Sequence, residues 1–282
     1  MNTITNETST ETTGKIHFGK TFLALVALGL PGVLSLIPMV LDQVEALPPE
    51  MLELPVPLTV ALALFNSLIL LAIAVAVGTL LAHRVGLRSL VAEKVRQGTA
   101  IWPELRPYLR MAFIAGLIFA VVVLGLDALI NPFAGTALEN VSTVGESPTL
   151  GALLTQLLMG MLYGGIVEEL LLRWGVMTLL VWIGWRIAQR GQGAPRPALV
   201  WAAIVLAALL FGIGHLPALA SLVALTPLIV FRTVLLNALG GLLFGWLFWR
   251  RNLETAMVAH AAGHVGFFVI NVGAALLNLA GS

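Results

Sequence analysis

Two adjacent glutamates and three histidines lie inside strongly apolar segments of this 282-residue chain, where an ionisable side chain is costly. Glu168 and Glu169 occur in YGGIVEELLLRWGV, His215 ends LLFGIGH, and His260 and His264 occur in MVAHAAGHVGFF. Glutamate and histidine are the side chains that most often activate water or bind a metal ion. We therefore expect a functional site among these residues, inside the apolar part of the protein.

The two glutamates are predicted to have different roles. Glu169 and Arg173 are four residues apart, so on a helix they share a face and can form an ion pair. Such a pair relieves the burial of both charges, and we interpret it as structural. Glu168 points about 100° away around the helix and has no cation nearby in the sequence. A carboxylate buried alone can act as a general base when water reaches it, and we expect this role for Glu168.

The histidines are predicted to complete the site. His260 and His264 are four residues apart, which is the spacing of helical zinc ligands, although two buried histidines bonded to carbonyls would look the same. His215 lies near the end of a different helix. Straight helices would place Glu168 and His215 at different heights, whereas tilt or different span ends would bring both near the midplane, and the sequence leaves both alternatives open. Asn237 is expected to line the site or to form a hydrogen bond between helices.

The composition predicts an all-α polytopic membrane protein. Hydrophobic residues make up 59% of the chain and charged residues only 10%, and the mean hydropathy is +0.99. A soluble domain carries about 25% charged residues. We expect about seven apolar helices, or eight if Pro227 breaks the sixth, with the active site inside the bundle. The stretches are placed near 21–41, 57–82, 111–131, 152–184, 198–216, 222–249 and 254–279.

Charge is distributed unequally between the loops. The loops at 83–110 and 185–197 and the pair at 250–251 are basic, whereas 42–56 and 132–150 carry acidic residues alone. By the positive-inside rule, the basic loops and the N-terminus are cytoplasmic. The expected location is therefore a plasma membrane, and the compact loops suggest a prokaryotic one.

The chain is predicted to have three parts. Residues 1–19 are polar and rich in threonine, which is typical of a flexible tail. Residues 20–149 are expected to form the N-terminal transmembrane helices, with a basic segment near 84–108 that is either an interfacial helix or a loop. Residues 150–282 contain the candidate site and are expected to form the catalytic core.

The order of the motifs resembles the CPBP family, which comprises CAAX proteases and bacteriocin-processing enzymes and is also described as the type II CAAX prenyl endopeptidase, or Abi, group. EELLLR (168–173) resembles the EExxxR motif of that family, and FGIGH (211–215) resembles FxxxH. MVAHAAGH (257–264) is similar to its last region, in which a histidine is followed four residues later by asparagine or aspartate. The resemblance covers roughly 150–270.

The resemblance implies an α-helical intramembrane endopeptidase, either a metalloenzyme or a glutamate-dependent protease. Glu168 would activate water with the help of His215, and Glu169 with Arg173 would be the structural pair. His260 would stabilise the oxyanion or bind a metal ion. Motifs of other intramembrane proteases, namely HExxH, GxSxG and GxGD, do not occur in the chain.

His264 departs from the family pattern, because it stands where the family has asparagine or aspartate. Imidazole can also donate a hydrogen bond to an oxyanion. Alternatively, His264 adds a ligand, so that Glu168, His215, His260 and His264 together hold a divalent metal ion, with zinc as the first candidate. A divergent, inactive member is the third alternative.

The expected partners are the lipid bilayer and a membrane-associated protein or peptide substrate, with prenylated CAAX proteins as one class. We expect no nucleic acid, and no sequence feature indicates the number of subunits. Two other functions remain open from the residues alone. Buried Glu, His and Arg also form proton relays in transporters, and a non-catalytic scaffold or immunity protein could bind peptides in the same cavity.

Overall fold

The computed structural model describes residues 18–45, 47, 54–133 and 149–281, and these ranges are helical with no strand. Seven helices are long and apolar enough to cross a membrane. The protein is therefore an all-α multi-pass membrane protein, as its composition predicts. The expected tail at 1–19 lies outside the described residues up to position 17, and α1 already begins at Phe18.

The helices are named below in chain order. They are α1 (Phe18–Leu34), α2 (Ile37–Glu45), α3 (Val56–Leu81), η2 (Ala82–Arg84), α4 (Leu90–Gln97), α5 (Ile101–Ile130), η3 (Asn131–Phe133), α7 (Leu150–Met159), η5 (Gly160–Glu168), η6 (Leu170–Met177), α8 (Thr178–Ala188), α9 (Pro197–Gly214), α10 (Leu216–Ala220), α11 (Pro227–Arg250) and α12 (Leu253–Gly281). From α7 to α8 the chain forms one continuous helix of 39 residues.

Local side-chain chemistry sets the beginnings of several helices. The Thr149 hydroxyl accepts a hydrogen bond from the Ala152 N–H and so caps α7. The Thr226 hydroxyl caps α11 in the same way, and Pro227 follows at the first helical position, where its missing N–H is not needed. The alternative in which Pro227 breaks the sixth span is therefore wrong, because the proline begins that helix.

The basic segment at 84–108 is divided in the structure. Its first part forms η2 and the short helix α4, which Ser89 caps at one end and Gly98 ends in the left-handed conformation at φ 75°. Residues from Ile101 onward belong to α5, which starts ten residues before the predicted third span. Leu90 of α4 is buried, so this helix packs onto the bundle rather than forming one long interfacial helix.

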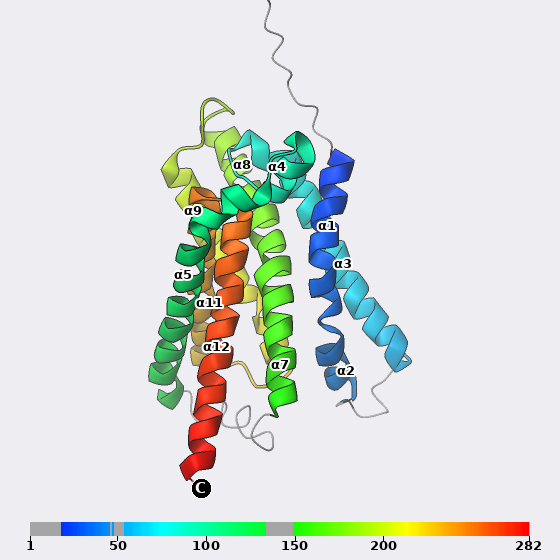
Figure 1. Ribbon diagram of the computed structural model, residues 1–282, viewed down its shortest axis with the longest axis vertical. Coiled ribbons are helices and arrows are strands. Elements are labelled where there is room, and N and C mark those ends of the chain that lie inside the picture. Colours follow the sequence, from blue (N-terminus) through cyan, green and yellow to red (C-terminus); the bar gives the residue numbers. More distant parts are fainter. Residues whose placement is uncertain (1–17, 46, 48–53, 134–148, 282) are drawn as a thin grey trace, which may run out of the picture.

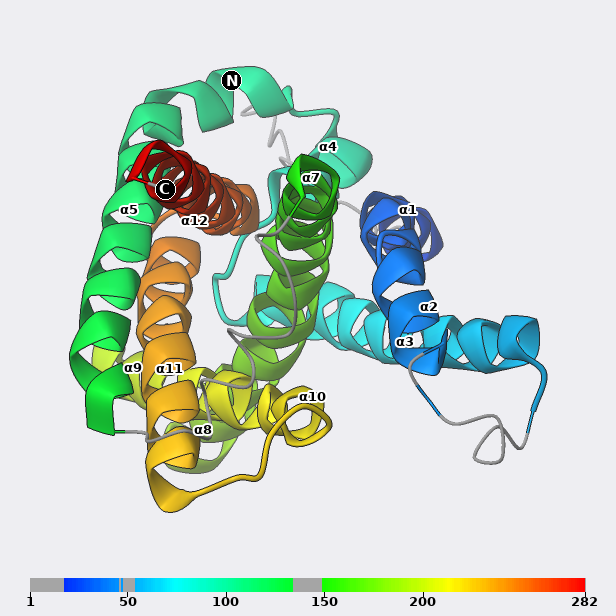
Figure 2. The same cartoon turned by 90° about the horizontal axis from the view of Figure 1, so that it is seen from below.

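The α7–α8 helix lies at the centre of the bundle (Figures 1 and 2). Its π-helical part contacts α12 on one side and α1 and α3 on the other, while α5 packs along α12 and α11 along α9. Leu71, Leu170, Ile204 and Phe248 come from four of these helices and are fully buried in one core. The central helix is therefore held on all sides by its neighbours.

Small residues let the helices around the site approach closely, as is usual in membranes. A Cβ atom on Gly116 of α5 would overlap the carbonyl oxygen of Ala259 in α12. A Cβ atom on Gly241 of α11 would lie 2.6 Å from the Cβ of Ala208 in α9. The run of glycines in α11 thus serves helix packing, as expected.

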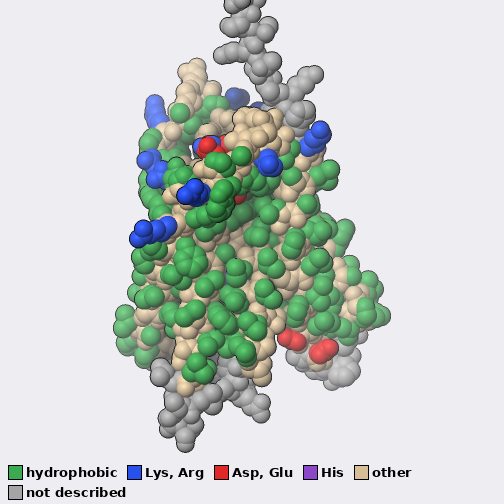
Figure 3. Space-filling model, viewed as in Figure 1, with side chains coloured by type: hydrophobic (Ala, Val, Ile, Leu, Met, Phe, Trp, Pro, Cys, Tyr) green, Lys and Arg blue, Asp and Glu red, His purple; other side chains and the backbone are tan. Residues whose placement is uncertain are grey.

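Charge divides the surface into two ends with an apolar band between them (Figure 3). The described Lys and Arg residues lie at the end that carries α4 and the loop between α8 and α9, with the exceptions of Arg173 and Arg232 inside the bundle. Asp42 and Glu45, at the end of α2, lie at the opposite end. We refer to these as the basic end and the acidic end.

Candidate functional site

The two glutamates lie where the central helix is π-helical. Glu168 ends η5, and η6 begins directly after Glu169. Turns with i→i+5 hydrogen bonds are rare and often occur at functional sites. Here they present two consecutive carboxylates to different neighbours, since Glu169 meets Arg173 and His260 while Glu168 faces His215 and His260.

The predicted ion pair between Glu169 and Arg173 is present. The Arg173 Nε lies 3.2 Å from Glu169 Oε2, and the two side chains are only 2% and 0% exposed. Arg173 Nη2 also donates to the carbonyl oxygen of Gly240 at 3.4 Å. The guanidinium lies 4.9 Å from the Phe211 ring centroid and 5.5 Å from that of Phe244, which are cation–π contacts. The buried cation is thus compensated by a carboxylate, a carbonyl and two aromatic faces.

His260 is held by the same carboxylate. Its Nδ1 lies 2.8 Å from Glu169 Oε1, and because a carboxylate only accepts, Nδ1 carries the proton. The ring is nearly parallel to Phe244 at 4.4 Å and to His264 at 5.2 Å, so it lies between them in one stack. The other nitrogen, Nε2, lies 3.8 Å from Glu168 Oε2.

His215 approaches Glu168 from the end of α9. Its Nδ1 lies 2.7 Å from the carbonyl oxygen of Phe211, which can only accept, so Nδ1 again carries the proton. Its Nε2 lies 3.9 Å from Glu168 Oε1. The structure decides between the two alternatives that the sequence left open, because it places the two residues at the same height. Glu168 precedes Ala188 by 20 residues and His215 follows Pro197 by 18, so the helices, which run in opposite directions, bring them level.

Glu168 therefore lies between two imidazole nitrogens whose neutral rings offer lone pairs toward it. The separations of 3.8 and 3.9 Å exceed hydrogen-bond length. A water molecule that donates one proton to the carboxylate and the other to a ring nitrogen would bridge such a gap. The Glu168 side chain is 17% exposed, which leaves it accessible to such a water. Its contacts match those of a general base rather than of a structural charge.

His264 faces the same small space from one turn further along α12. A Cβ atom on Gly164 would lie 2.6 Å from His264 Nε2 and 3.4 Å from His260 Nε2, so both nitrogens are directed at the surface of Gly164. His264 also lines a cavity of about 330 Å³ between α7 and α12. The structure thus brings His264 next to His260, and among the described residues His264 forms no ion pair or hydrogen bond with Glu168.

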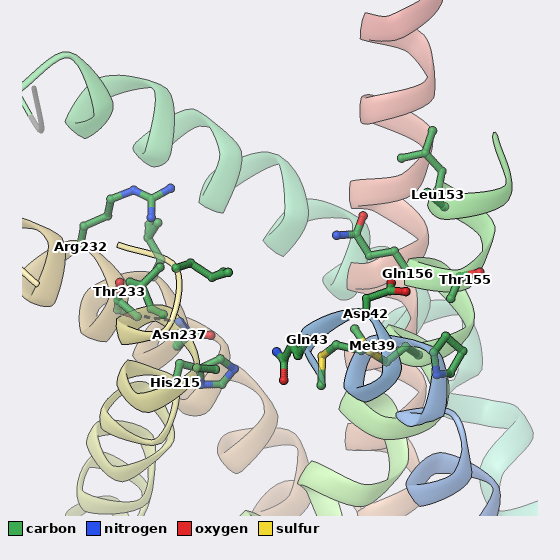
Figure 4. Close-up of a pocket in the computed structure, with 17 residues that line it drawn as sticks. Met39, Asp42, Gln43, Leu153, Thr155, Gln156, His215, Arg232, Thr233 and Asn237 are labelled. Carbon is green, nitrogen blue, oxygen red and sulfur yellow. Dashed lines mark hydrogen bonds between the residues drawn. The ribbon is translucent and has the colours of Figure 1, made fainter. Parts of the chain in front are cut away.

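Asn237 lies beside the site rather than in it. Its Nδ2 donates to the Thr233 carbonyl oxygen of its own helix at 2.8 Å, so it forms no bond between helices. Together with His215 and Arg232 it lines a cavity of about 950 Å³ (Figure 4). Arg232 forms an ion pair with Asp127 of α5, which explains how this second buried cation is tolerated.

Comparison with known proteins finds one family. Residues 149–265 match the family model described as type II CAAX prenyl endopeptidase Rce1-like. This segment is therefore similar to the Rce1-like family. Searches among curated proteins and among solved structures returned no match. The matched segment contains Glu168, His215, His260 and His264, and it supports protease activity of the CAAX type in general.

The donors of the candidate site suit zinc in type, because neutral imidazole Nε2 atoms and a carboxylate are common zinc ligands. The His215 and His260 rings also give their Nδ1–H to an oxygen acceptor, as metal-binding histidines do. As arranged, however, no three His, Cys, Asp or Glu side chains among the described residues are grouped so that they could hold an ion. Metal binding at Glu168, His215, His260 and His264 therefore stays a prediction.

Three contributors to the site were not predicted. Phe244 stacks on His260, Gly164 makes room for two ring nitrogens, and Asp127 pairs with Arg232. Gly164 could have been found from the sequence, because it lies four residues, about one helical turn, before Glu168. A small residue at that position leaves space beside the candidate general base. Phe244 and Asp127 come from other helices, and nothing in their local sequence distinguishes them from packing or solvated residues.

Proposed function

We propose that the protein is an intramembrane endopeptidase that hydrolyses a peptide bond of a membrane-associated substrate with water activated by Glu168. The supporting observation is that Glu168 lies between the Nε2 atoms of His215 and His260. The neighbouring Glu169 instead forms an ion pair with Arg173 and accepts a hydrogen bond from His260. The Glu168 carboxylate is therefore available as a general base, whereas the Glu169 carboxylate stabilises the positions of Arg173 and His260.

In this mechanism Glu168 takes a proton from water, and the oxygen attacks the carbonyl carbon of the scissile bond. His215 Nε2 accepts the second proton of the water in a hydrogen bond and so orients it. The negative charge that develops on the carbonyl oxygen is stabilised by imidazole N–H donors. The proton on Glu168 then passes to the departing amine, which leaves a carboxylate and an amine as products.

The tautomers suggest how the two histidines of α12 divide the oxyanion role. A neutral His260 has its proton at Nδ1, so it can donate from Nε2 only when the ring is doubly protonated. No hydrogen bond is recorded for His264 among the described residues, so its ring is free to carry a proton on Nε2, which faces the space over Gly164. His264 is therefore the donor that we assign first, in the position where the family has asparagine or aspartate.

The test compares the two neighbouring glutamates. The substrates are synthetic CAAX peptides with and without a farnesyl group, offered to full-length protein purified in detergent. Glu168→Gln is expected to lower kcat by about 10²–10⁴-fold, which is the usual contribution of a general base, with little change in thermal stability. Glu169→Gln is expected to lower stability as well, because it removes the charge that compensates the buried Arg173. Full cleavage by Glu168→Gln would contradict the proposal.

The metal-dependent form of the mechanism has a direct measurement. Zinc, if held by Glu168 and the histidines, would supply Lewis-acid polarisation of the scissile carbonyl. Elemental analysis of purified protein is expected to show near-stoichiometric zinc that is lost in His215→Ala and His260→Ala if this form is correct. Absence of zinc from wild-type protein that cleaves peptide would contradict it and leave Glu168 as the sole activator of water.

Orientation in the membrane follows from charge. Under the positive-inside rule the basic end faces the cytoplasm, which places the N-terminus of α1 on that side and the end of α12 on the other. A prokaryotic plasma membrane remains our expectation for the location.

A further inference from the structure

We infer that the active site opens toward the acidic end of the bundle, so that substrate reaches Glu168 from the non-cytoplasmic half of the membrane. The substrate class in this inference rests on the proposed protease function. The side of the membrane from which substrate enters is inferred from the distribution of cavities and charges.

The large cavity lies entirely in one half of the bundle. His215 is at its inner end, and through this residue it reaches the candidate site. Its walls come from α2, α7, α10 and the first half of α11, as Figure 4 shows for the labelled residues. In Figure 1 these parts lie at the end of the molecule opposite α4 and α8. Asp42 and Leu222 also line the cavity. The cavity therefore extends to the acidic end.

The path from the site toward the basic end is filled. After Glu169 the central helix buries Leu170, Trp174, Met177 and Val181 in succession. These side chains pack against others from α9 and α11 in the main core, including Ile204. Packed apolar side chains leave no room for a peptide. The smaller cavity beside His264 lies between α7 and the middle of α12, on the acidic side of His264.

Charge then decides which side of the membrane this is. At the acidic end the described residues include Asp42 and Glu45 and no Lys or Arg other than Arg232, which is paired with Asp127. The positive-inside rule therefore puts the cavity mouth outside the cytoplasm. Because Arg232 is paired with Asp127, it adds no net positive charge to the cavity wall.

The substrate class follows from this direction. The cavity suits a polypeptide segment with both apolar and polar side chains, because nine of its 17 lining residues are apolar and the others are polar or charged, among them Gln43, Gln156 and Asn237. We assign to this protein substrates whose scissile bond is presented from the outer half of the membrane, such as exported or membrane-anchored polypeptides. Tails that remain in the cytoplasm would meet the packed end of the bundle.

The chain contains no cysteine, so each single-cysteine variant carries one thiol. Gln156→Cys reports on the cavity wall. Leu158→Cys is the matched control, because Leu158 lies on the same helix, is 57% exposed and lines neither cavity, which directs it to lipid. Gln192→Cys marks the basic end. A charged, membrane-impermeant maleimide is applied to spheroplasts and to inside-out vesicles that contain the full-length protein.

Gln156→Cys is expected to react at least tenfold faster in spheroplasts than in inside-out vesicles, Gln192→Cys to show the reverse, and Leu158→Cys to react slowly in both. Reaction of Gln156→Cys from the same side as Gln192→Cys would overturn the inference, as would a Gln156→Cys rate no higher than that of Leu158→Cys. The labelling does not depend on catalysis and is repeated in Glu168→Gln. Failure of the protease proposal would therefore appear in the cleavage assay and leave the labelling pattern unchanged.

Discussion

At the scale of single residues, the site depends on how two adjacent carboxylates are partnered. Glu169 is fully buried and compensated by Arg173, and it accepts the Nδ1 proton of His260. Glu168 has no arginine beside it and faces two ring nitrogens across gaps that suit water. Only 17% of its side chain is exposed, so the water it would activate is separated from bulk solvent, where electrostatic interactions are weaker.

His264 offers the sharpest test at this scale. His264→Asn keeps an N–H donor at the position, so peptide cleavage is expected to stay within about tenfold of wild type. His264→Leu keeps a similar volume beside His260 but removes the donor, and loss of one oxyanion donor typically lowers kcat by about 10²–10³-fold. Measurement of kcat for both variants, with thermal unfolding as the check on packing, decides the point. Equal activity of the leucine and asparagine variants would rule out the donor role.

At the scale of elements, the π-helical part of the central helix decides what the site can contain. Gly160 and Gly164 in η5 leave the space that the His264 and His260 rings enter from α12. A side chain at Gly164 would occupy the place toward which both Nε2 atoms point. The close approach of these two helices is therefore part of the site as well as of the packing.

Alanine substitution distinguishes the role of Gly164 in the site from the role of glycine in helix packing. Gly164→Ala is expected to abolish most cleavage activity, because its methyl group would fill the space between the ring nitrogens and the substrate. Gly151→Ala on the same helix is the matched control, since a Cβ there meets only the Thr149 hydroxyl at 3.8 Å. Cleavage and melting temperature are measured for both. Wild-type kcat in Gly164→Ala would show that the reaction takes place elsewhere.

At the scale of the whole molecule, the basic end is joined to a helix of the candidate site by a buried carboxylate. Glu254, in the first turn of α12, accepts hydrogen bonds from the Ser89 hydroxyl at 2.7 Å and from the N–H groups of Leu90 and Val91 at 2.8 and 3.0 Å. These N–H groups begin α4, where a negative charge is favourable. The contact fixes the start of the helix that carries His260.

Glu254→Gln is expected to lower the free energy of unfolding by about 1–3 kcal/mol, because hydrogen bonds to a charged group are lost or weakened in a buried place. Glu93→Gln is the control, since Glu93 pairs with the half-exposed Arg88 and such pairs contribute about 0–1 kcal/mol. Thermal unfolding in detergent and hydrogen exchange of α4 measure the difference. If the two variants are equally stable, the Glu254 contact does not anchor this end.

Much of this architecture was open to prediction because it depends on local properties. Apolar length indicates each span, and loop charge indicates the sides of the membrane. Spacing of four residues correctly predicted the pairing of Glu169 with Arg173. The order of the motifs also pointed to the family whose model matches residues 149–265.

The tertiary structure alone decided the rest, because it depends on which distant atoms meet. Helical period says where a side chain points on its own helix, but it does not say that Glu168 lies level with His215, or that Arg232 finds Asp127. The proton positions on His215 and His260 follow from partners in the folded protein. The direction in which the site opens follows from side-chain packing, since one half of the bundle is filled and the other contains the cavity.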